Sequence, residues 1–136
     1  MTRLLLAVAI ALAAVGVAAL IKRRRPDAPT QGSGHVPMQV DRRDFMRPDF
    51  PWAVLVFTSA TCASCAEVWG QASTLGNDTV TVQEVEVALT PELHERYDID
   101  AVPLVLIVDI DGVSRRWFLG PTARNEIADA VTELTG

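Results

Sequence analysis

Cysteine and histidine are scarce in this chain of 136 residues, which has only Cys62, Cys65, His35 and His94. A structural zinc site needs four ligands as a rule, and these four residues are poorly spaced for one, so a metal site would require a second chain. The sequence also lacks a Cys-x-x-Cys-His motif and therefore shows no signal for covalent haem attachment. The two cysteines could still be a redox pair, half of a shared metal site or two inert thiols.

Basic residues are few in the larger, C-terminal part of the chain. Residues 41–136 hold seven arginines against sixteen aspartates and glutamates, a formal balance of −9, whereas the whole chain carries −5. Nucleic-acid binding depends on basic side chains that neutralise phosphates, so we expect no nucleic-acid partner. The acidic surface is expected to serve solubility.

Polar side chains are absent from Leu4–Ile21, a run of 18 residues. As a helix this run would be about 27 Å long, close to the hydrocarbon thickness of a bilayer. A secretory signal peptide is the alternative, with small residues near Gly16–Ala19 as cleavage sites. The basic run Lys22–Arg25 argues against cleavage, suits anionic lipid headgroups and favours a cytoplasmic C-terminal side. We therefore expect residues 1–25 to form a single-pass membrane anchor, with the rest of the chain on the cytoplasmic rather than the extracytoplasmic face.

Residues 26–37 are rich in proline, glycine and small polar residues and show no apolar periodicity. This composition is typical of a flexible tether, here with a reach of about 20 Å. His35 is expected to be a solvated tether residue. The tether would lead to one domain at residues 38–136, and no internal repeat is present.

The remaining sequence alternates strand-like and helix-like segments. The apolar run Trp52–Thr58 predicts a strand buried on both faces. Val80–Leu89 alternates but slips once in phase, which predicts a more solvated face or a bulge. The further elements expected are helices at 62–73 and 91–98, a hairpin at 103–120 with its turn at Asp111-Gly112, and a last helix at 121–134 with Thr122 as its N-cap. This order predicts an α/β domain with a central mixed sheet flanked by helices.

Three aromatic side chains and one histidine receive structural rather than functional interpretations. Trp52, Trp69 and Trp117 are expected to pack in the core. His94 is surrounded in sequence by charged residues and is expected on the surface of its helix.

The two cysteines follow a buried strand and open a helix, a context that favours redox chemistry. With Cys62 near the helix N-cap, free backbone N–H groups and the helix dipole would stabilise its thiolate and lower its pKa. Cys62 would then be the nucleophile. Cys65, on the same turn, would resolve the mixed disulfide.

Taken together, the strand, the CxxC helix, Val102-Pro103 before the hairpin, the Asp111-Gly112 turn and Gly120 before the last helix resemble the thioredoxin superfamily. The resemblance implies a thioredoxin-like fold, a redox-active Cys62–Cys65 disulfide and no organic cofactor. It also implies a cis bond before Pro103, with the backbone of Val102 presented to an extended substrate segment. The expected partners are protein thiols or disulfides and a separate redox partner.

The chain departs from the family pattern at several positions. Ala63-Ser64 stands between the cysteines where the family usually has Gly-Pro, and Thr61 replaces a tryptophan. Val56 occupies the place of a buried acid, and Glu84 that of an accompanying lysine. Glu84 could therefore act as the acid/base group, or it could be an exposed strand residue.

These observations favour a membrane-tethered protein that catalyses thiol–disulfide exchange on protein substrates. Two other functions stay open. One is a non-catalytic binding or chaperone-like module at the membrane, which the loss of the buried acid favours. The other is an extracytoplasmic redox protein of cell-envelope or cytochrome maturation, which the anchor-and-tether layout resembles.

Overall fold

The computed structural model of the chain describes residues 1–24 and 34–136, without the side chains of Arg3 and residues 18–24. Its first helix, α1, spans Thr2–Arg24. Among the described residues, no helix meets the length and apolarity required to cross a membrane. The side chains at the end of the predicted anchor, residues 18–21, lie outside the described part of the chain, as does most of the predicted tether.

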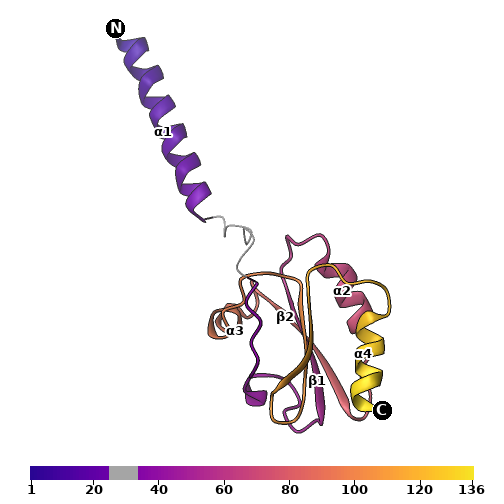
Figure 1. Cartoon of the computed structure of the whole chain (residues 1–136). Coiled ribbons are helices and arrows are strands. Elements are labelled where there is room, and N and C mark those ends of the chain that lie inside the picture. The colour runs from indigo at the N-terminus through magenta and orange to yellow at the C-terminus, as the bar shows by residue number, and fades with distance from the viewer. Residues whose placement is uncertain (25–33) are drawn as a thin grey trace.

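The centre of the domain is a mixed four-stranded sheet (Figure 1). Its strands are β1 (Trp52–Thr58), β2 (Val80–Glu86), β3 (Leu104–Val108) and β4 (Ser114–Leu119), in the order β2-β1-β3-β4. β1 runs parallel to β2 and antiparallel to β3, and β3 and β4 form the hairpin. The predicted mixed sheet is therefore confirmed, and its longest apolar run, β1, is the buried central strand.

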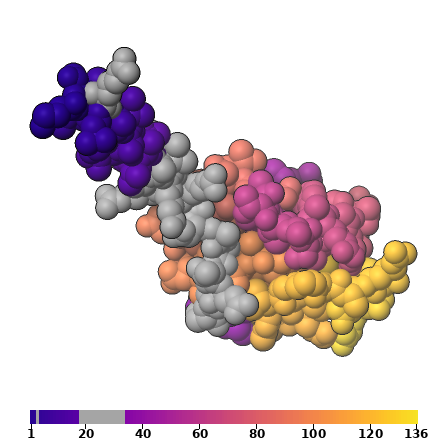
Figure 2. All heavy atoms as spheres, turned by 90° about the horizontal axis from the view of Figure 1, so that it is seen from above, coloured from indigo at the N-terminus to yellow at the C-terminus, as the bar shows by residue number. Residues whose placement is uncertain are grey.

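Helices α2 (Cys65–Ala72) and α4 (Glu126–Thr135) cover one face of this sheet and lie side by side (Figures 1 and 2). The other face is covered by α3 (Pro91–Arg96) and by the chain that precedes β1, which includes the short 3-10 helix η1 (Arg42–Asp44). Each face buries its own apolar cluster, so β1 and β3 contribute to both. The predicted flanking of the sheet by helices is thus confirmed.

The segment from Gly34 to Val40 packs along the sheet rather than standing free. A Cβ on Gly34 would lie only 2.9 Å from a methyl group of Leu119, at the end of β4. Further along, Ser114 donates its N–H to the Met38 carbonyl (3.0 Å), and Val40 donates to the Gly112 carbonyl (2.9 Å). The segment thus runs antiparallel to β4.

Asp44 of η1 connects the chain that precedes β1 to the end of α3. The Tyr97 hydroxyl donates to one oxygen of its carboxylate, and Arg96 pairs with the other, each at 2.5 Å. Both partners favour the charged form, so they hold the pKa of Asp44 below its ordinary value. The contact fixes the chain before β1 onto the face that α3 covers.

The slip in the alternation of β2 does not come from a bulge, because the register with β1 is continuous from Val80 to Glu86. Val80 and Val82 contribute to the cluster under α2, whereas Val85 faces the opposite cluster under α3. Apolar residues therefore change face halfway along the strand because each half is covered by a different element. Of the two alternatives predicted for this slip, a more solvated face or a bulge, the bulge was wrong.

His94 is buried, with 6% of its surface exposed, so the predicted surface position was wrong. Its ring Nε2 lies 2.7 Å from the Val85 carbonyl, and the ring packs edge-on against Phe57. The short helix α3 thus turns its histidine toward the sheet. A buried polar ring is tolerated there because a backbone group satisfies it.

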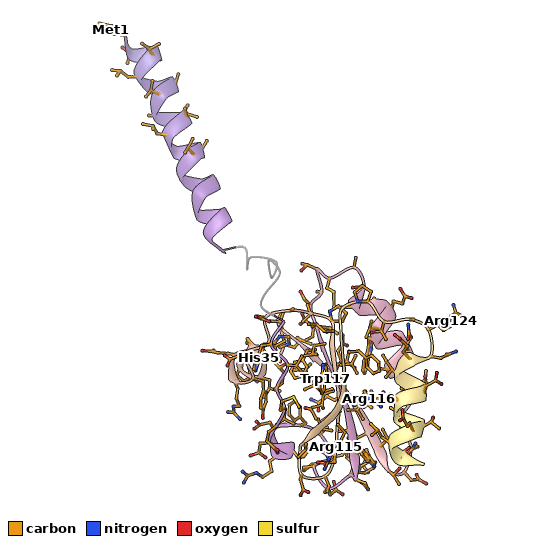
Figure 3. The ribbon with its side chains drawn as sticks, viewed as in Figure 1. Met1, His35, Arg115, Arg116, Trp117 and Arg124 are labelled. Atoms are coloured by element: carbon orange, nitrogen blue, oxygen red, sulfur yellow. A yellow bond between two sulfur atoms is a disulfide. The ribbon has the colours of Figure 1, made fainter. Side chains whose placement is uncertain are left out.

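Two further expectations need correction. Helix α4 begins at Glu126 with Asn125 as its N-cap, and the Thr122 hydroxyl instead donates to the Gly120 carbonyl. Trp117 is 43% exposed on β4, at the edge of the four-stranded sheet (Figure 3), so its predicted position in the core was wrong. Trp52 and Trp69 do pack against the core, as expected.

Candidate functional site

The two cysteines lie where β1 ends and α2 begins, joined by a disulfide. Their Cα atoms are 5.4 Å apart. Cys65 is buried, with 3% of its surface exposed, whereas Cys62 is partly exposed. Cys62 is therefore the cysteine of the pair that is more accessible from the surface, and Cys65 lies behind it.

The start of α2 differs from the prediction by a few residues. The N-cap is Ser64 and the first helical residue is Cys65, so Cys62 precedes the helix instead of capping it. Residues 60–64 form turns, and the Cys62 N–H donates to the Ser59 carbonyl at 3.1 Å. The Ser64 hydroxyl lies 3.7 Å from the Cys62 sulfur. The helix N-terminus is therefore adjacent to the disulfide, with Cys65 inside the first turn.

The Val102–Pro103 peptide bond is cis, the geometry that the resemblance implies. Pro103 directly precedes β3, whose first residue, Leu104, pairs with Phe57 near the end of β1. The Pro103 carbonyl accepts a hydrogen bond from Gly120 (2.8 Å). The start of β3 and the cysteine loop, residues 59–64, therefore lie at the same end of the sheet. Substrate docking on Val102 and Pro103 stays a prediction.

Val56 and Glu84 are paired residues on neighbouring parallel strands, so both side chains project toward α2. Val56 is fully buried among the apolar residues under α2. Glu84 is exposed at the edge of the sheet, and its Oε1 accepts a hydrogen bond from the buried Thr58 hydroxyl at 2.8 Å. The carboxylate thus reaches the end of β1, just before the cysteine loop, and its acid/base role stays a prediction.

Glu86 is a residue of this site that the sequence did not reveal. Its Oε1 accepts the Ala60 N–H (3.2 Å), and its Oε2 accepts the N–H groups of Ala88 (2.9 Å) and Leu89 (3.1 Å). One carboxylate therefore joins the loop before Cys62 to the loop after β2. The alternating pattern of β2 showed only that residue 86 is a polar strand position. The N–H groups that bind Glu86 are brought to it only when both loops fold.

No group of three or more His, Cys, Asp or Glu side chains within residues 1–24 and 34–136 is arranged to hold a metal ion. The arrangement offers the chemistry of a disulfide between a partly exposed cysteine and a buried one, next to a helix N-terminus.

No family model and no curated protein matches this chain. Solved structures do match. A thioredoxin mutant from Halobacterium salinarum is 20% identical with a TM-score of 0.57, over 65% of this chain and 79% of that one. Thioredoxin 1 from Thermosipho africanus is 17% identical with a TM-score of 0.54, over 61% of this chain and 93% of that one. Together with the sheet order and the disulfide at the start of α2, these similarities show that the chain has a thioredoxin-like fold.

Proposed function

We propose that this protein catalyses thiol–disulfide exchange on protein substrates through Cys62 and Cys65. The observation that carries the proposal is the position of the disulfide, with one cysteine partly exposed and the other buried at the start of α2. The thioredoxin-like fold supports it.

In the reducing direction, the Cys62 thiolate attacks one sulfur of a substrate disulfide, and the other substrate sulfur leaves as a thiolate. The Cys65 thiolate then attacks the Cys62 sulfur of this mixed disulfide, and the second substrate sulfur leaves. The substrate gains two electrons and the protein ends with the Cys62–Cys65 disulfide. A dithiol of a partner protein returns it to the reduced state, and the same steps in reverse oxidise a substrate. No organic cofactor takes part in these steps.

This function predicts that the full-length protein accelerates reduction of insulin disulfides by dithiothreitol. Protein that has been reduced and alkylated with N-ethylmaleimide is the control, because its thiols are blocked while its fold is otherwise the same. Equal rates for the active and the alkylated protein would contradict catalysis and favour the non-catalytic binding module.

We also propose that Leu4–Ile21 anchors the protein in a membrane as a single pass, with the domain on the cytoplasmic face. The support is the apolar run and the basic residues that follow it. We expect the protein to sediment with membranes and to resist extraction with carbonate. In intact cells, a membrane-impermeant thiol reagent should label Cys62 and Cys65 only after reduction and permeabilisation. Labelling of intact cells after reduction alone would place the domain on the extracytoplasmic side.

Glu84 is our proposed acid/base group, supported by its hydrogen bond to Thr58 at the end of β1. A carboxylate that moves a proton during exchange makes the rate depend on its own titration. Glu84→Gln should therefore remove one inflection from the pH profile of insulin reduction and lower the plateau rate. Asp78→Asn, which removes an exposed acid beyond α2, is the matched control. An unchanged pH profile in Glu84→Gln would remove Glu84 from the mechanism.

A further inference from the structure

We infer that the redox site recognises an extended, basic segment of its protein partner with an apolar residue beside the target cysteine. This inference rests on the proposed function, because it names the class of substrate that would exchange with Cys62. Two features carry it: the exposure of Leu89, and the acidic charge of the chain segment that carries the cysteines.

Leu89 is 81% exposed, more than any other large apolar side chain described between residues 34 and 136. Single exposed leucines are common on protein surfaces. Leu89 differs because its backbone is fixed next to the reactive loop. Its N–H and that of Ala60, two residues before Cys62, bind the same Glu86 carboxylate.

A further backbone hydrogen bond holds the two loops together. Val87 donates its N–H to the Thr58 carbonyl at 3.0 Å, which continues the contact between β2 and β1 beyond the last paired residues. Leu89 thus projects from a fixed backbone rather than from a free loop. It can contact a substrate side chain without first being ordered, and that lowers the entropic cost of binding.

The cysteine loop itself offers no comparable contact. Residues 59–64 are Ser, Ala, Thr, Cys, Ala and Ser, with no charged, aromatic or large aliphatic side chain. A peptide that lies across Cys62 therefore meets a loop of small, neutral residues, and Leu89 stands exposed on the loop that Glu86 joins to it. An apolar substrate residue near the target cysteine is the chemistry that matches Leu89.

The chain segment that carries the cysteine loop has charged side chains of one sign only, although Arg124 lies in the loop before α4 (Figure 3). Between Arg47 and Arg96 the chain has no lysine or arginine but seven acidic residues. Glu67 lies exposed in the first turn of α2, and Glu84 lies exposed at the end of β2. Both positions flank the cysteine loop. A basic substrate segment would be attracted to this end of the domain, and an acidic one would be repelled.

The test uses the full-length protein, reduced and freed of reductant, and three synthetic disulfide-linked peptides. The first carries leucine beside its cysteine and two lysines further along; the second has serine in place of that leucine; the third has glutamates in place of the lysines. Burial of most of a leucine side chain corresponds to about tenfold in rate, so the first peptide should be reduced about tenfold faster than the second. It should also be reduced faster than the third at low salt, with a ratio that falls as salt is added.

Leu89→Ser should abolish the preference for the first peptide over the second. Ile110→Ser is the matched control, because Ile110 is exposed in the hairpin turn at the opposite end of the sheet. Equal rates for all three peptides, or a leucine preference that survives in Leu89→Ser, would overturn the inference while leaving the proposed function intact. A different outcome would overturn the proposed function itself. If the wild-type protein reduced none of the peptides faster than Cys62→Ser does, both the proposed function and this inference would fail.

Discussion

Cys62→Ser is expected to lower the rate of substrate disulfide reduction to the rate measured without protein. The partly exposed Cys62 sulfur is the one that can form the first bond with a substrate, and a serine hydroxyl is not a nucleophile toward a disulfide at neutral pH. The measurement is reduction of insulin disulfides by the full-length variant, followed by turbidity.

Cys65→Ser should behave differently, because the first step remains possible while the second does not. The variant should accumulate a covalent complex with substrate through Cys62, visible on a non-reducing gel and released by dithiothreitol. Ala66→Ser, next to Cys65 but exposed, is the matched control and should turn over normally. If Cys65→Ser rather than Cys62→Ser lost the ability to form the complex, the roles of the two sulfurs would be reversed.

Gly112→Ala is expected to destabilise the protein by about 2–5 kcal/mol, the sum of a left-handed backbone cost and overpacking. Gly112 has φ +80°, and an added Cβ would collide with the backbone carbonyl oxygen of Val40. The N–H of Val40 also donates a hydrogen bond to the Gly112 carbonyl. If Val40 moved away to relieve the collision, this hydrogen bond would break. The movement would also disturb the core, in which Val40 is buried.

Urea unfolding of the full-length protein, followed by tryptophan fluorescence, measures this effect. Gly70→Ala is the matched control because Gly70 lies inside α2 with open space around its Cα. There the substitution removes only a poor helix former, so stability should rise by about 0.5–1 kcal/mol. A Gly112→Ala variant as stable as the wild type would show that the Gly34–Val40 segment can leave the sheet at no cost.

Much of this fold could be predicted because it depends on local pattern. β1 was predicted with its observed bounds, because a continuous apolar run between Pro51 and Ser59 is typical of a buried strand. The turn at Asp111-Gly112 likewise follows from residues that accept positive φ. The mixed sheet and its β3–β4 hairpin followed from the order of the elements.

The features that could not be predicted depend on contacts between distant residues. His94 looks like a surface residue until α3 packs against β2 and brings its ring to the Val85 carbonyl. Glu86 looks like any polar strand residue until two loops bring three N–H groups to its carboxylate. At the candidate site, the spacing of the two cysteines predicted a redox pair, whereas the contacts around the pair could not be predicted from the sequence.

Gly34 packs against Leu119, and this contact fixes the point at which the chain enters the domain. Leu119 pairs with Leu104, which follows Pro103, so the chain enters the domain at the same end as the disulfide. Ten peptide steps separate Arg24 from Gly34, a span of at most about 35 Å. In the membrane-anchored protein proposed above, a partner held beside the end of α1 would meet Cys62 at an effective concentration on the order of millimolar. At that concentration, even a weakly binding redox partner would occupy the site for much of the time.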